Sequence, residues 1–180
     1  GSVESLPVDG TSFLPVLRGS SNSHRTFVYG MHNNYPEGPP YPIRSVCDGR
    51  YHWIHNLRPD EIYIEKHLMG VKDDGRLNNR YWQDWVWHAT TDRRTYDLVA
   101  RYQRRPEFEL YDLSVDPFEH QNLVDNPDLE DVRRRLADAL ETWMTEQGDP
   151  GIPVDTRAVH GASRSGQFPY GPAGAKVDHQ

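Results

Sequence analysis

The chain has 180 residues, and its 20 Lys and Arg against 27 Asp and Glu give a formal net charge of -7 at pH 7. This acidic balance opposes a general polyanion-binding surface, so nucleic acid is not an expected partner. Hydrophobic residues make up 36% of the chain and the mean hydropathy is -0.85, which predicts a small core in one domain, or in a compact domain with a tail.

The chain contains no run of 18 apolar residues and no apolar segment that follows a cluster of positive charges. We therefore expect neither a membrane span nor an export signal in the sequence as given. The chain has a single cysteine, Cys47, which excludes an internal disulfide and a thiolate-rich zinc site.

The first elements along the chain are a loop, a strand and a second loop. Residues 7–19 carry short apolar patches between Pro and Gly, which predicts a loop with at most one helical turn. Residues 26–31 are rich in β-branched and aromatic side chains and predict a strand. Residues 32–40 include three prolines, and because proline has no amide donor this stretch should be irregular.

Residues 41–57 predict a β-hairpin, because Asp48-Gly49 separates two β-prone runs and suits the positive φ angles of a two-residue turn. Pairing outward from that turn sets Arg44 opposite Trp53. We expect the more aromatic of the two hairpin faces to be the core face. It carries Arg44, Val46, Tyr51, Trp53 and His55.

Residues 58–105 form an insertion of uncertain shape, in which Trp82, Trp85 and Val86 lie at helical spacing. An amphipathic helix would continue from there until Pro106 stops it. The tryptophans of this region are a candidate carbohydrate platform, but aromatic side chains at helical spacing are more typical of a core or an interface, and we favour burial in a partner domain.

Residues 107–113 alternate strictly between polar and apolar side chains and predict a strand that directs Phe108 or Leu110 inward. Glu107 and Glu109 would then be same-face neighbours on a solvated sheet edge rather than an acid–base pair.

The best-marked helix begins after Asn126, a good N-cap, with Pro127 in the first turn. Gly148 supplies its C-terminal stop. Its apolar stripe consists of Leu129, Val132, Leu136, Leu140 and Trp143. Residues 151–180 are rich in Gly, Pro and Ser, which predicts an extended or mobile tail.

The local signatures of common enzymes are absent: there is no G-x-S-x-G, P-loop, H-E-x-x-H or dinucleotide-binding glycine motif. Cys47, at the end of a predicted strand, is more typical of packing than of catalysis. His52 and His55 would point to opposite faces of their strand and so would not chelate a metal together. We assign no catalytic residue and no metal ligand to this chain.

The loop over residues 32–40 presents His32, Asn33 and Asn34, whose side chains both donate and accept hydrogen bonds. This composition suits a site that binds sugar hydroxyl groups, and the open alternative is that these residues form a surface loop without a binding role. Arg44 has two open roles as well, because it suits stacking on Trp53 or binding an anion.

Three segments, taken in order, resemble the C-terminal region of type I sulfatases. They are residues 9–19, residues 41–57 and residues 109–123, the last with Asp116-Pro117-Phe118-Glu119 followed by Asn122-Leu123. The phrases Tyr41-Pro42-Ile43-Arg44-Ser45-Val46 and His55-Asn56-Leu57 are most similar to the heparan N-sulfatase (sulfamidase) branch. The resemblance extends over about residues 7–150.

The resemblance implies an α+β fold in which an antiparallel sheet of about four strands packs against a C-terminal helix. Residues 1–19 would lead in from a catalytic domain outside this chain, and residues 20–150 would form the sulfatase C-terminal subdomain. The wall of the substrate pocket would include His32, Asn33, Asn34, Tyr41 and Arg44. Its substrate would be a sulfated glycan such as heparan sulfate.

The resemblance also implies a parent enzyme that uses Ca²⁺ and a formylglycine made from a Cys/Ser-x-Pro-x-Arg motif. Cys47 precedes Asp48-Gly49-Arg50 and lacks that spacing, so we expect no cofactor in this chain and no activity of the chain alone. The partner would be the N-terminal catalytic domain, and the isolated chain would self-associate through surface that this domain covers. The family resemblance implies a periplasmic, secreted or lysosomal location.

A stand-alone carbohydrate-binding or protein-interaction module is the alternative function. In that case the tryptophan cluster would be exposed, and a glycan would bind without any further domain.

Overall fold

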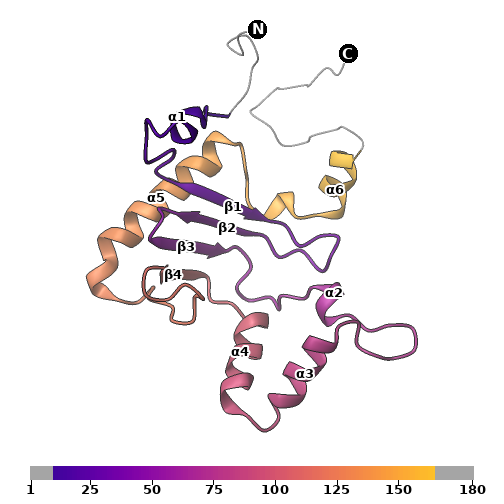
Figure 1. The fold of residues 1–180 in the computed structure, drawn as a ribbon. Coiled ribbons are helices and arrows are strands. Elements are labelled where there is room, and N and C mark those ends of the chain that lie inside the picture. The colour runs from indigo at the N-terminus through magenta and orange to yellow at the C-terminus, as the bar shows by residue number, and fades with distance from the viewer. Residues whose placement is uncertain (1–9, 165–180) are drawn as a thin grey trace.

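The computed structural model describes residues 10–164 of the chain. It contains a 4-stranded antiparallel sheet in the order β1-β2-β3-β4, with α5 lying across one face (Figure 1). The strands are β1 Val28–His32, β2 Ile43–Cys47, β3 Tyr51–Asn56 and β4 Phe108–Asp112. This arrangement confirms the predicted α+β class with a small antiparallel sheet and a C-terminal helix.

The helices lie before, between and after the strands. They are α1 Leu14–Leu17, α2 Lys66–Met69, α3 Arg80–His88, α4 Arg93–Gln103, α5 Glu130–Glu146 and α6 Arg157–Arg164, with 3-10 turns at Pro127–Leu129 and Ile152–Val154. The single helical turn expected in the N-terminal segment is α1, whereas residues 1–9 lie outside the described part. Within residues 10–164, no helix has both the length and the apolar character needed to span a membrane.

The β2–β3 hairpin forms as predicted, but its turn lies one residue further along the chain. Asp48 N donates to Tyr51 O at 3.1 Å, so the central residues are Gly49 and Arg50, and Gly49 has φ 95°. The Asp48 carboxylate accepts from Arg50 N at 2.9 Å and Tyr51 N at 2.7 Å. An aspartate that bonds the following amides precedes the turn instead of entering it.

This turn changes the predicted pairing by two residues. Arg44 lies opposite His55, and Val46 lies opposite Trp53, so the expected pairing of Arg44 with Trp53 is wrong. A shift of two preserves which side chains share a face, because side chains alternate along a strand. The prediction of the core face therefore holds although the register does not.

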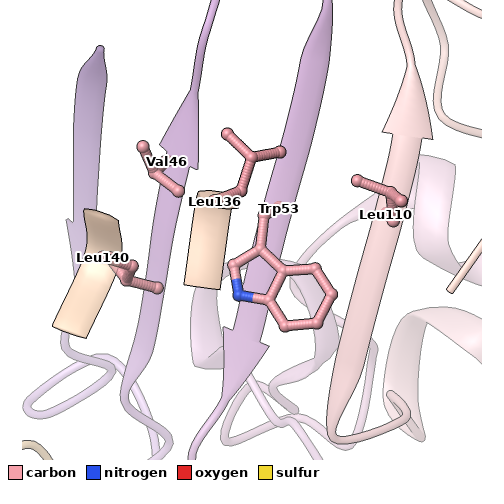
Figure 2. Packing of buried hydrophobic residues seen from close by; sticks show 5 residues of the cluster. All are labelled: Val46, Trp53, Leu110, Leu136 and Leu140. Carbon is pink, nitrogen blue, oxygen red and sulfur yellow. The ribbon is translucent and has the colours of Figure 1, made fainter. Parts of the chain in front are cut away.

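The core lies between that face and α5. It consists of Val46, Trp53 and Leu110 from three strands and Leu136 and Leu140 from the helix (Figure 2). Each is at most 4% exposed, and burial of a side chain of this size stabilises the fold by about 1.5–3 kcal/mol. At the edge of the core, the rings of Tyr29 and Trp143 stack with centroids 5.0 Å apart.

Helix α5 begins and ends at the predicted signals. Asn126 accepts from Asp128 N at 3.0 Å and caps the 3-10 turn that leads into the helix. Gly148 has φ 63°, and the next amide, Asp149 N, bonds back to Met144 O at 2.8 Å. This is the left-handed glycine stop expected at the end of a helix.

The region after β3 corrects two predictions. The single helix expected to run toward Pro106 is divided into α3 and α4, because Asp92 caps a new helix through Thr95 N at 2.7 Å. Glu109 is 4% exposed and accepts from Asn56 Nδ2 at 2.7 Å and from the Tyr111 hydroxyl. The solvated edge expected for Glu109 is therefore wrong, since α4 and the chain after β4 close over this part of the sheet.

The segment after residue 150 also differs from the extended tail that its composition predicts. A 3-10 turn at Ile152–Val154 leads to α6, and Asp155 between them is 1% exposed. Residues 165–180, the rest of the predicted tail, lie outside the described residues.

Candidate functional site

The five predicted wall residues lie together where β1 ends and β2 begins. Asp155 connects this loop to the C-terminal segment: its carboxylate accepts from Asn34 N at 2.9 Å, Tyr35 N at 2.8 Å and Tyr41 N at 2.6 Å. Both ends of the loop are thus fixed by one buried side chain. Hydrogen bonds to an ionised acceptor are about twice as strong as neutral ones.

Arg44 forms a second connection from β2 to the chain after α5. Its Nε and Nη2 donate to the two oxygens of Asp149, the Nη2 bond at 3.1 Å. Its Nη1 donates to His32 O at 3.2 Å, Asn33 Oδ1 at 3.1 Å and Ile43 O at 2.9 Å. The Arg44 side chain is 0% exposed, so this planar group serves as a buried bidentate clamp. Stacking of Arg44 on Trp53, one of its two predicted roles, is replaced by the pair with Asp149.

Asn34 fixes the interior of the loop. Its Nδ2 donates to Pro39 O at 2.7 Å and to Ile64 O at 2.8 Å, and the residue is 0% exposed. It therefore connects the two halves of the proline-rich loop to the segment that precedes α2.

Aromatic rings line the inner side of the site. Tyr63 makes edge contacts with His32 at 5.9 Å and with Tyr41 at 5.3 Å between ring centroids. Burial raises the pKa of Tyr63 to about 12, so its hydroxyl is neutral at neutral pH. The protein around His32 removes part of the solvent from its ring and lowers its pKa, although the residue remains exposed.

The structure separates the predicted residues by exposure. The side chains of Asn34, Tyr41 and Arg44 are buried, Asn33 is half-buried, and His32 is exposed. The sequence reasoning missed Asp149, Asp155 and Tyr63. No local pattern marks these three residues as part of a site. For Asp149 and Asp155, the sequence shows only that they are acidic residues within a Gly- and Pro-rich segment.

One group of the described residues brings three candidate metal ligands together. Atoms of Glu37, Glu65 and His67 lie within 4.8 Å of one another. Glu65 already accepts from His67 N at 2.9 Å and Leu68 N at 2.8 Å, and Glu37 lies 3.3 Å from Lys66 Nζ. The amide bonds to Glu65 cap α2, and Lys66 compensates the charge of Glu37, so we assign no metal to the group.

The residues present do not fit a formylglycine centre. Cys47 lies at the end of β2, half-buried, and its Sγ accepts from Gly49 N at 3.3 Å within the hairpin turn. Neither the sequence around Cys47 nor the candidate site supplies the Cys/Ser-x-Pro-x-Arg element.

Comparisons with known proteins agree on one class. A family model described as N-sulphoglucosamine sulphohydrolase, C-terminal, matches residues 82–146. An ulvan-active sulfatase of Formosa agariphila is 32% identical over 157 residues, which is 83% of this chain and 28% of that protein. The human N-sulphoglucosamine sulphohydrolase is 28% identical over 151 residues, again 83% of this chain and 28% of that protein.

A solved structure described as a 2-O GAG sulfatase aligns with 89% of this chain and 23% of its own length, at 19% sequence identity and a TM-score of 0.46. The family model and the curated relatives support a sulfatase C-terminal domain, so the chain corresponds to that part of the sulfatases. This confirms the resemblance found in the sequence.

Proposed function

We propose that this chain is the part of a sulfatase that forms one wall of the substrate pocket, in an enzyme that hydrolyses a sulfate ester or N-sulfo group of a sulfated glycan. The observation that carries the proposal is the 32% identity to a sulfatase over 83% of the chain. The loop after β1 supports it, because two buried carboxylates fix that loop against the C-terminal segment. A wall must hold its shape to select a substrate.

The five wall residues divide into two roles in this proposal. His32 and Asn33 lie at the exposed side of the loop and contact the substrate. Asn34, Tyr41 and Arg44 are buried and position those two, since their hydrogen-bonding groups are directed into the protein. Arg44 thus acts on the substrate through Asn33 rather than by direct contact.

The partner in this proposal is an N-terminal catalytic domain. The chain spans 28% of the length of each of the two relatives described above, and the residues of this chain do not fit the formylglycine centre. Formylglycine and Ca²⁺ would belong to the catalytic domain, where they supply the sulfate-transfer chemistry. This chain supplies shape, hydrogen bonds and stability.

Kinetics of the full-length sulfatase that contains this chain test the proposal. We expect His32→Ala to raise KM for a sulfated glycan at least about threefold with little change in kcat, because a wall contact contributes uniform binding. His88→Ala, on the exposed side of α3, is the matched control. Unchanged kinetics in His32→Ala, or release of sulfate by the 180-residue chain alone, would contradict the proposal.

One observation favours the alternative of a stand-alone module. Trp85 and Trp87 are 47% and 73% exposed, whereas Trp82 is buried. The same exposure is expected if a catalytic domain covers these side chains in the whole enzyme. A calorimetric titration of this chain with heparan sulfate separates the two, because the module alternative requires binding that Trp87→Ala abolishes.

A further inference from the structure

A cavity of about 410 Å³ lies on the opposite side of the sheet from α5. Side chains of α3, α4, β3, β4 and the chain after β4 line it. It is lined by Ile54, Trp85, Thr95, Leu98, Val99, Arg101, Tyr102, Arg105, Glu109, Tyr111, Phe118 and Glu119. This volume lies in the range of small-molecule sites.

The cavity is open and has aromatic walls. Its rim includes Trp85, Leu98 and Phe118, which are 47%, 40% and 78% exposed. Tyr102 and Tyr111 contribute two further rings from α4 and β4. Flat aromatic walls of this kind bind the face of a ring through stacking and apolar contact.

Arg105 is the lining residue whose hydrogen-bonding capacity is unused. Its Nε is buried without a hydrogen-bond partner, and among residues 10–164 no hydrogen bond is formed by its guanidinium. The nearest carboxylate oxygen, Glu109 Oε1, lies 3.9 Å from Nη1, and the Arg105 side chain is 24% exposed. A buried donor of this kind normally has a partner, because leaving it unpaired costs free energy.

The guanidinium of Arg105 is also fixed in orientation. It lies over the rings of Tyr63 at 5.4 Å and Tyr102 at 5.7 Å from the ring centroids. Such stacking holds the planar group without using its N–H donors. Nε is enclosed by protein, whereas the Nη1 and Nη2 donors are not buried. These two nitrogens therefore remain available, in a fixed plane, for a ligand that brings oxygen acceptors.

The other charged groups of the lining already have partners. Arg101 donates to the backbone oxygens of His120 and Glu119. Glu109 accepts from Asn56 and Tyr111, and Glu119 pairs with His52 at 2.5 Å. The capacity left for a ligand in this lining is thus that of a cationic donor.

We propose that this cavity binds a six-membered ring that carries a carboxylate or sulfate group, with the oxyanion on Arg105 and the ring against the aromatic walls. A carboxylate or sulfate matches the guanidinium fork with two parallel hydrogen bonds. The site uses none of the five wall residues, although Arg105 stacks on Tyr63, which contacts His32 and Tyr41. A failure of the sulfatase proposal would leave it untouched, because it involves no sulfate hydrolysis.

Saturation-transfer NMR on the 180-residue chain tests the proposal, with glucuronate and glucose 6-sulfate as saccharide probes and benzoate as an aromatic probe. Glucose is the neutral control. We expect at least one anionic probe to bind at least about tenfold more tightly than glucose. The saccharide and aromatic arms show which kind of ring the walls prefer. No binding by any anionic probe at millimolar concentration would overturn the site.

Variants connect the binding to the cavity. Arg105→Gln should weaken the bound probe at least about tenfold, and its exposed neighbour Arg104→Gln should leave binding unchanged. Leu98→Trp fills the rim of the cavity, leaves Arg105 in place and should also abolish binding. It tests the site if circular dichroism shows that Arg105→Gln does not fold. Wild-type affinity in a folded Arg105→Gln or Leu98→Trp variant would refute the proposal.

Discussion

Arg44 and Arg105 belong to two regions of the molecule that hold an arginine side chain in different ways. In the clamped loop, Arg44 donates to Asp149 and to three further oxygens, and its side chain is 0% exposed. In the α4 cavity, Arg105 is held by two tyrosine rings and has an unpartnered Nε. The two arginines differ both in exposure, 0% against 24%, and in how many of their N–H donors have acceptors.

The two faces of the sheet also differ in what their polar side chains do. The face toward α5 holds the apolar core and ends at the Arg44 clamp, so its polar groups serve the fold. On the opposite face, polar and aromatic side chains of α4, β3 and β4 surround an open cavity. The following predictions test this contrast.

The largest effect should come from removing the clamp. Arg44→Ala leaves the Asp149 carboxylate without its cation, and breaking a buried pair from one side costs about 3–5 kcal/mol of unfolding free energy. Chemical denaturation monitored by circular dichroism measures it. The control is Arg134→Ala, which removes an exposed ion pair on α5 and should cost less than about 1 kcal/mol of unfolding free energy. Equal losses in the two variants would break the contrast.

Removing the other anchor should have the next largest effect. Asp155→Ala leaves the amides of Asn34, Tyr35 and Tyr41 without their acceptor, at about 2–3 kcal/mol in total after the loop relaxes. Hydrogen exchange should accelerate at those three amides first. Asp138→Ala, exposed on α5, is the control, and unchanged exchange of the loop amides in Asp155→Ala would contradict the assignment.

A smaller effect depends on pH and concerns the ion pair between the exposed Arg50 and the buried Asp112. Hydrogen bonds from Arg50 and Ser114 hold the pKa of Asp112 well below its ordinary value. The resulting stabilisation is complete above the ordinary aspartate pKa of about 4 and is lost as the pH falls from there toward the folded-state pKa.

The difference in Tm between wild type and Asp112→Asn should therefore be constant at pH 5 to 7 and shrink below about pH 4. Thermal unfolding across this range measures it, with Asp128→Asn as the exposed control. A difference that stays the same down to pH 3 would show that Asp112 is not preferentially ionised in the folded state.

The smallest effect on stability should come from Trp87→Ser, because Trp87 is 73% exposed and surface substitutions cost within about 0.5 kcal/mol. We expect the isolated chain to self-associate through the exposed aromatic side chains of α3, Tyr81, Trp85 and Trp87, and this variant to weaken that association. Sedimentation velocity over a concentration series measures it, with Val115→Ser, 79% exposed beyond β4, as the control. A wild-type chain that is monomeric throughout would refute the expectation.

The elements that could be predicted from the sequence are those specified by neighbouring residues. Helix α5 follows from Asn126, the apolar stripe and Gly148, all within one segment. The β2–β3 hairpin and its core face follow from alternation around Asp48-Gly49. The turn itself was placed one residue early, because composition does not show that the Asp48 carboxylate binds the amides of Arg50 and Tyr51.

The candidate pocket wall could be predicted in part, because some of its residues are neighbours in the sequence. The loop from His32 to Pro40 is visible as a proline-rich stretch with hydrogen-bonding side chains. Its anchors were not visible, because Asp149 lies 105 residues from Arg44 and Asp155 lies 121 residues from Asn34. The burial of Glu109 was missed as well, since it depends on packing by α4.

By itself, the sequence determined the α+β class, the order of the main elements and the sulfatase resemblance, because propensity, periodicity and motif order are properties of adjacent residues. The tertiary structure alone decided which charged side chains are satisfied and which are available. Hydrogen bonding and burial arise between segments far apart in the chain, so Arg44 and Arg105 become different only when the sheet, α4 and the C-terminal segment come together.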